Sequence, residues 1–83
     1  MINLLVTGGA GFIGSNFINY IFDKIDNLNI INIDAMYYCA NQENININIR
    51  NSNNYKFIKC NTNNSEIIAY ILEKNQIDYV INF

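Results

Sequence analysis

The four glycines of this 83-residue chain all lie between residues 8 and 14, directly after a short apolar run. That run, Ile2 to Val6, is rich in aliphatic residues, which predicts a buried parallel strand. In the segment Thr7-Gly8-Gly9-Ala10-Gly11-Phe12-Ile13-Gly14, the glycine spacings satisfy both G-x-G-x-x-G and T-G-x-x-G-x-x-G. A glycine-rich turn between a strand and a helix is typical of dinucleotide-binding proteins.

Each glycine of the second spacing has a physical task in such a turn. Gly8 lets the chain turn sharply away from the strand, and Gly14 lets the following helix pack close to it. Gly11 has no Cβ, so the backbone can come close to a pyrophosphate. The start of the helix would then present free N–H groups and its positive dipole end to the phosphates.

Two helices are expected. The first runs from Phe12 to Ile25, because apolar residues recur there at helical spacing. These residues are Ile13, Phe17, Tyr20, Ile21 and Ile25. The second is expected to take Ser65 as its N-cap, with Glu66 in its first turn and Asn75 at its end. Its apolar stripe comprises Ile67, Ile68, Ile71 and Leu72.

Three further strands are expected, at Leu28 to Ile33, Tyr55 to Cys60 and Asp78 to Phe83. Residues 35–54 are polar and are interpreted as a long loop with a short helical turn, although Ile45, Ile47 and Ile49 alternate with Asn as in an exposed strand. This order predicts an α/β fold, the N-terminal half of a Rossmann fold. We expect a parallel sheet of four strands in the order 3-2-1-4 with flanking helices. Residues 1–83 would form one truncated NAD-binding domain.

Composition argues against several other classes of function. The net charge is −2 and the basic residues are scattered, so no basic face for nucleic acid or a membrane surface is expected. There is no histidine and there are only two cysteines, too few ligands for a zinc site. Cys39 and Cys60 are interpreted as free thiols. No signal peptide or membrane-spanning run is evident, and a cytoplasmic location is expected.

An acid stands where a dinucleotide fold needs one. Asp34 closes the second strand, about 20 residues after the glycine turn. Its carboxylate would accept hydrogen bonds from the adenosine ribose, and its charge would repel the 2′-phosphate of NADP. Ala35 and Met36 supply no arginine to offset that repulsion, so NAD is the expected cofactor.

Four stretches of the chain resemble, in order, the opening of the nucleotide-sugar 4,6-dehydratases, which are extended short-chain dehydrogenases acting on dTDP-glucose or UDP-glucose. They are VTGGAGFIGSNF, IDAMYYCANQENI, YKFIKCNTN and IDYVINF. The stretch from Asp34 to Asn44 is similar to the D-x-L-x-Y-x-x-N-x-x-N segment of that family. Its Tyr38-Cys39 is similar to the branch that uses UDP-glucose.

The resemblance implies roles for particular residues. Phe12 and Ile13 would lie against the pyrophosphate through their backbone. Asp34, Ala35, Met36 and Tyr37 would line the adenosine ribose, and Asn61 and Thr62 would flank the adenine. The family usually has G-D-I where this chain has Cys60-Asn61-Thr62, and it has glycine at the position of Ala40. Asn61 accepts a hydrogen bond without charge assistance, so weaker binding is expected.

The family's catalytic Tyr-x-x-x-Lys and Asp-Glu pairs have no counterpart in the chain. Tyr20 and Lys24 match the first spacing, but both are assigned to the first helix, with Tyr20 on its core face. No catalytic residue is therefore assigned. We expect the NAD-binding portion of a 4,6-dehydratase-like protein, inactive alone and acting on a nucleotide sugar only if completed by the missing half. The alternatives are a non-catalytic nucleotide-binding or partner-pairing module, and one half of a split enzyme.

The last strand leads to an expectation about assembly. In the order 3-2-1-4 it lies at an edge of the sheet, and residues 79–83 are largely apolar. An apolar edge strand is a site of pairing or aggregation. The isolated chain is therefore expected to be oligomeric, aggregating or partly molten.

Overall fold

A computed structural model describes residues 1–36 and 40–83. Its strands are β1 (Ile2–Thr7), β2 (Leu28–Asp34), β3 (Tyr55–Lys59) and β4 (Tyr79–Asn82). They form one parallel sheet in the order β3-β2-β1-β4. This confirms the predicted α/β class and strand order, and each strand boundary lies within one residue of the expected one. The central strands β1 and β2 are mostly buried, whereas the edge strands β3 and β4 are half-buried or exposed.

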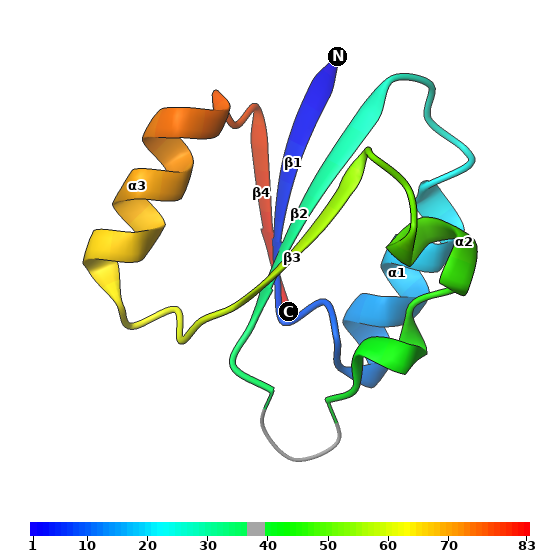
Figure 1. Ribbon diagram of the computed structural model, residues 1–83, viewed down its shortest axis with the longest axis horizontal. Helices are drawn as coiled ribbons and strands as arrows, with labels where there is room; N and C mark the ends of the chain where they lie inside the picture. The colour runs from blue at the N-terminus through cyan, green and yellow to red at the C-terminus, as the bar shows by residue number, and fades with distance from the viewer. Residues whose placement is uncertain (37–39) are drawn as a thin grey trace.

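Helices cover both faces of the sheet (Figure 1). On one side lie α1 (Phe12–Ile21), the 3₁₀ turn η1 (Gln42–Asn44) and α2 (Ile47–Arg50); on the other lies α3 (Ser65–Asn75). The buried side chains form two clusters, one on each face. The cluster under α1 contains Leu4, Val6, Ile18, Leu28, Ile30, Ile45 and Ile49. The cluster under α3 contains Leu5, Ile31, Ile33, Cys60 and Ile71.

The expected apolar face of α1 is wrong in part. Tyr20 is 68% exposed and Ile13 is 69% exposed, whereas the residues that α1 buries are Gly14, Ser15 and Ile18. The rotation of the helix is set by Gly14, which must face the turn at Gly8 and Gly9 at close range, and Ile18 follows it one turn later. The helix also ends at Ile21, four residues before the expected Ile25, and Ile25 is exposed.

Residues 40–54 contribute more to the core than a loop would. Ile45 and Ile49 are fully buried, while Ile47 between them is exposed. Ile45 has extended backbone between η1 and α2, and Ile49 lies in α2; both join the apolar cluster on that face of the sheet. The short helical turn expected here is present, and the core role of Ile45 and Ile49 was not predicted.

The start and part of the stripe of α3 also differ from expectation. Its N-cap is Asn64, whose side chain accepts a hydrogen bond from the N–H of Ile67, and Ser65 is the first helical residue. Of the predicted stripe, Ile71 is buried and Ile68 packs against its cluster, but Ile67 and Leu72 are about 40% and 41% exposed. The helix ends at Asn75 as expected, and Gln76 takes the left-handed conformation that closes many helices.

Candidate functional site

The glycine turn leaves the carboxyl end of β1, at the edge of the sheet where the other parallel strands also end. Gly8 has a φ of +76°, a conformation that favours glycine, and its N–H donates to the carbonyl of Ile33 at the end of β2. The sharp departure from β1 that was predicted for Gly8 is therefore present. It brings the start of α1 to the same edge as Asp34.

Two other glycines make room for tight packing, and one opens onto free space. A Cβ on Gly14 would lie 2.3 Å from the carbonyl oxygen of Gly8, so α1 packs on the turn with no space for a side chain. A Cβ on Gly9 would lie 2.2 Å from Oδ1 of Asn32. At Gly11 the nearest atom would be 3.5 Å away. Gly11 thus faces space that a ligand can approach.

Most N–H groups of the turn are already used inside the protein. Gly9 donates to Asn32 Oδ1 at 3.0 Å and Ala10 donates to Asp34 Oδ2 at 2.9 Å. The first bond of α1 runs from the N–H of Ser15 to the carbonyl of Gly11. The N–H groups of Phe12 and Ile13, in the first turn of α1, have no carbonyl one turn earlier to bond. They are the donors that this site presents to an anion, at the positive end of the helix dipole.

The carbonyl of Ala10 accepts hydrogen bonds from two asparagines. The backbone N–H of Asn41 donates to it at 3.0 Å, and the side-chain amide of Asn44 donates at 2.9 Å. These are the two asparagines of the segment that resembles the dehydratase family. Their contacts show that they fix the glycine turn, a role that the sequence reasoning did not assign.

Asp34 lies at the centre of this arrangement and is 8% exposed. One carboxylate oxygen accepts from Ala10 and the other accepts from the N–H of Met36 at 2.8 Å. A carboxylate has about four acceptor positions, so ribose hydroxyls can still be accommodated. Met36 itself has a φ of +61°, which turns the chain away from the strand. Tyr37, also predicted to line the ribose, lies outside the described residues.

Two adjoining clefts share Gly8, Asp34 and Phe83. The larger, about 530 Å³, is also lined by Gly11, Phe12, Ile13, Gly14 and Ala40. The smaller, about 150 Å³, is also lined by Thr7, Ile33, Ala35, Asn61, Thr62 and Asn82.

The structure therefore brings the predicted phosphate, ribose and adenine residues to one edge of the sheet. Met36 does not line either cleft, but its N–H donates to Asp34, which lines both. Five lining residues were not predicted as cofactor-binding: Ala40 and Ile33, and, at the ends of β1 and β4, Thr7, Asn82 and Phe83. The hydroxyl of Thr7 donates to the side-chain oxygen of Asn82, which joins the ends of β1 and β4. The signal that would have found them is the rule that parallel strands end at one edge of a sheet.

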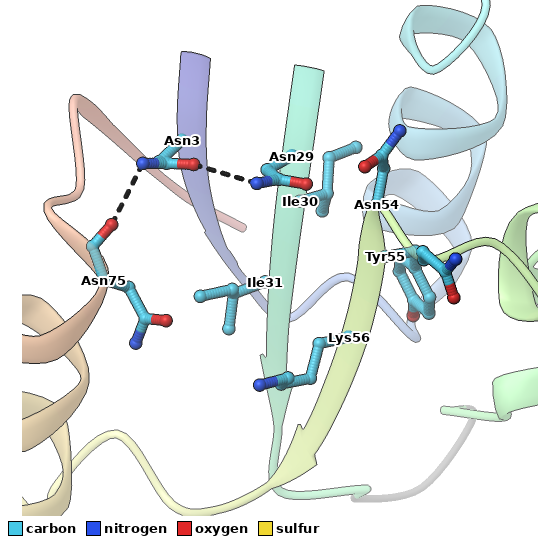
Figure 2. Close-up of a pocket in the computed structure, with 9 residues that line it drawn as sticks. Asn3, Asn29, Ile30, Ile31, Asn54, Tyr55, Lys56 and Asn75 are labelled. Carbon is cyan, nitrogen blue, oxygen red and sulfur yellow. Dashed lines mark hydrogen bonds between the residues drawn. The ribbon is translucent and has the colours of Figure 1, made fainter. Parts of the chain in front are cut away.

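A separate hollow of about 140 Å³ lies near the amino ends of the strands (Figure 2). There the side chain of Asn3 donates to the carbonyl of Asn75 at 3.0 Å and accepts from Asn29 at 3.1 Å. These amides bond to each other and to the end of α3. The hydrogen bonds of Asn3 therefore join the end of α3 to the sheet beside this hollow.

Tyr20 and Lys24 do not contribute to either cleft. The ammonium of Lys24 lies 5.5 Å from the ring centroid of Tyr20, a cation–π pair on the exposed surface of α1. Within residues 1–36 and 40–83, no group of three or more metal-ligating side chains is present. The same residues include no helix long and apolar enough to cross a membrane.

Comparison with known proteins gives one family and consistent relatives. Residues 5–83 match the family model described as GDP-mannose 4,6 dehydratase. A protein of Dictyostelium discoideum named dTDP-D-glucose 4,6-dehydratase is 43% identical over 79 residues, which are 95% of this chain and 18% of that protein. The human protein of the same name is 41% identical over 80 residues, 96% of this chain and 23% of that one.

Solved structures agree with the sequence relatives. A dTDP-glucose 4,6-dehydratase from Bacillus anthracis, crystallised in complex with NAD, superposes with a TM-score of 0.93 at 38% identity and covers 100% of this chain. One from Streptomyces venezuelae, with NAD and TYD bound, gives a TM-score of 0.86 at 27% identity over 99% of this chain. This chain covers 26% of each of those two structures, and about a fifth of the length of the two curated relatives.

Proposed function

Because the chain belongs to the family described as GDP-mannose 4,6 dehydratase, we propose that it forms the NAD-binding portion of a 4,6-dehydratase that acts on dTDP-glucose or UDP-glucose. The observation that carries the proposal is the pair of clefts that meet at Asp34. One holds the unpaired N–H groups at the start of α1, and the other holds Asn61 and Thr62. Residues 1–83 act in this proposal as one cofactor-binding unit.

The residues present fit this cofactor. Gly11 leaves the space that a pyrophosphate would fill, and the N–H groups of Phe12 and Ile13, in the first turn of α1, would donate to it. Asp34 and the adjoining Ala35 and Met36 would hold the adenosine ribose, and Asn61 and Thr62 would flank the adenine. NAD would supply the hydride acceptor, while this chain would bind and orient it. The solved relatives that contain NAD support the assignment.

The direct test is calorimetric titration of the chain with NAD and with NADP. We expect binding of NAD and weaker binding of NADP, because the charge of Asp34 would repel a 2′-phosphate. Gly11→Ala is the sharpest variant, since its new methyl group meets only ordinary contacts in the protein but enters the space left for the pyrophosphate. It should keep the fold and lose most of the NAD affinity.

The control for Gly11→Ala is Asn16→Ala, an exposed position on the same helix outside both clefts. It should bind NAD like the parent chain. If the parent chain releases no binding heat with either nucleotide, the proposal is wrong. Unchanged NAD affinity in Gly11→Ala would show that the pyrophosphate lies elsewhere.

We also propose that a second copy of the chain pairs along β4. Among the described residues β4 has a strand neighbour on one side only, and its Tyr79 and Val80 are 64% and 55% exposed. An almost wholly apolar groove of about 340 Å³ adjoins them, lined by residues of β1, α1 and β4 such as Leu4, Phe17 and Ile81. The cytoplasmic location expected from the sequence remains part of this proposal. The free, buried thiol of Cys60 is in keeping with it.

A further inference from the structure

One fully buried polar side chain, Asn32, lies in the middle of β2. In the sheet register it stands between Val6 of β1 and Phe57 of β3, and its own strand is otherwise apolar at Ile30 and Leu28 on the same face. A buried amide is costly unless each of its polar groups is bonded. Its presence in a core position therefore calls for a role that an aliphatic residue cannot fill.

The amide of Asn32 bridges the glycine turn and β3. Its Oδ1 accepts from the N–H of Gly9 at 3.0 Å, and its Nδ2 donates to the hydroxyl of Tyr55 at 3.0 Å. The two ends of an amide are chemically different, so the Tyr55 hydroxyl determines which end faces the turn. Burial raises the pKa of Tyr55, so this hydroxyl stays protonated at neutral pH.

Gly9 and Asn32 fit one another sterically as well. The side-chain oxygen of Asn32 occupies the place where a Cβ of residue 9 would stand, so Gly9 is needed for the bond to form. The bond directs the Gly9 N–H into the protein and fixes the peptide between Gly8 and Gly9, which leads into Ala10. Since α1 begins two residues after Ala10, the direction of the Phe12 and Ile13 N–H groups depends on this peptide.

We propose that Asn32 is a positioning residue for the cofactor phosphates, and that Tyr55 orients it. The side chain touches no ligand; it fixes the turn from which the phosphate-binding N–H groups project. This inference rests on the proposed function, because it concerns how that site holds a pyrophosphate. It predicts an effect confined to ligands that carry phosphates.

The test compares ADP with adenosine in the full chain and in Asn32→Leu. Loss of the bond to Gly9 should weaken ADP and NAD binding by about tenfold, equivalent to ~1.4 kcal/mol, and leave adenosine affinity within about twofold. Asn29→Leu is the matched control: the same substitution in the same strand, at the far end of the sheet where Asn29 donates to Asn3 (Figure 2). It should leave the ratio of ADP to adenosine affinity unchanged.

A second variant covers the case in which Asn32→Leu fails to fold. Tyr55→Phe keeps the ring and removes only the hydroxyl that orients the amide, and it should weaken ADP by about threefold with adenosine unaffected. Equal losses for ADP and adenosine in these variants, or the same loss in Asn29→Leu, would overturn the proposal. Such a result would mark Asn32 as a residue of general stability only.

Hydrogen exchange of the ligand-free chain separates this inference from the proposed function. The Gly9 amide should exchange at least about tenfold faster in Asn32→Leu than in the parent, while amides of the central strand such as Leu5 remain protected. If the parent binds no NAD but Gly9 behaves in this way, the proposed cofactor is wrong and the control of the turn by Asn32 stands. Unchanged Gly9 exchange would refute that control directly.

Discussion

At the scale of the residue, the glycine turn of the candidate site is held in place by side chains that bond to its main chain. Asn32 accepts from the N–H of Gly9, Asp34 accepts from the N–H of Ala10, and Asn44 donates to the carbonyl of Ala10. Two of these three are amides, which bond without bringing a charge into the protein. The negative charge of Asp34 is the one placed where it would also select the ribose.

Asn61 offers a residue-scale prediction about the adenine. Its side-chain oxygen accepts from the N–H of Asn63 at 2.9 Å, so the loop after β3 is already shaped by an acceptor at this position. Asn61→Asp keeps that acceptor and adds a charge. We expect it to strengthen NAD binding by up to ~1 kcal/mol, because a charge-assisted bond to the adenine amino group would replace a neutral one.

Titration with NAD and with nicotinamide mononucleotide would check this. The gain should be confined to NAD, since the mononucleotide has no adenine. Asn63→Asp, two residues further along the same loop, serves as the control for added charge alone. An equal gain from Asn63→Asp would attribute the effect to charge at a distance rather than to contact with the adenine.

At the scale of the element, the two longer helices, α1 and α3, begin in different ways. The start of α1 has no side-chain cap and no acidic residue in its first turn, which leaves its N–H groups for a ligand. By contrast, α3 has the Asn64 cap and Glu66 in its first turn, and it lies outside both clefts. An uncapped start thus distinguishes the helix that serves the candidate site.

The cap of α3 can be tested by stability. Asn64→Ala removes the acceptor of the Ile67 N–H and should lower the free energy of unfolding by about 1 kcal/mol. Ser65→Ala, at the neighbouring exposed residue, should change it by less than about 0.5 kcal/mol. Denaturant unfolding of both variants decides between them. A larger decrease in the free energy of unfolding for Ser65→Ala than for Asn64→Ala would show that Ser65 is the N-cap, as the sequence pattern predicts.

Element types could be predicted from the sequence because each strand is a short apolar run and each glycine of the turn has a distinct steric task. The helix faces were less predictable. Tyr20 and Ile13 fit a helical stripe, but the close approach of Gly14 to the turn sets a different rotation. In the candidate site, the end of the second strand located Asp34, and the resemblance to the 4,6-dehydratases located Asn61 and Thr62.

The hydrogen bonds that fix the glycine turn could not be predicted from the local sequence pattern. An asparagine within a strand looks like a defect until its two partners, 23 residues away on either side, are known. The same holds for Asn44, which reaches Ala10 across 34 residues. Tertiary contacts of this kind leave no periodic signal in the sequence.

At the scale of the whole molecule, the protein is a thin three-layer body measuring 32 × 30 × 19 Å. Its two apolar clusters lie on opposite faces of one sheet, so each is shallow. In the centre of the sheet, β1 and β2 are mostly buried. At its β4 edge, apolar residues are exposed beside an apolar groove. Stability is therefore expected to depend on what covers that side.

Self-association along β4 is the corresponding prediction. We expect the chain to give concentration-dependent sedimentation, and Val80→Lys to shift it strongly toward monomer, because charged residues discourage pairing at an exposed edge strand. Ile47→Lys on α2 is a matched control, since Ile47 is 59% exposed and Val80 is 55% exposed. A concentration-independent monomer with a sharp thermal transition in the parent chain would contradict the proposed pairing.

The fit between Gly9 and Asn32 also has a consequence for sequence divergence. Because a Cβ at position 9 and the amide at position 32 would claim the same space, the two positions cannot change independently. Among homologous chains, a side chain at position 9 should occur only together with a smaller residue at position 32. Any such pair would mark a lineage that holds its turn by other means.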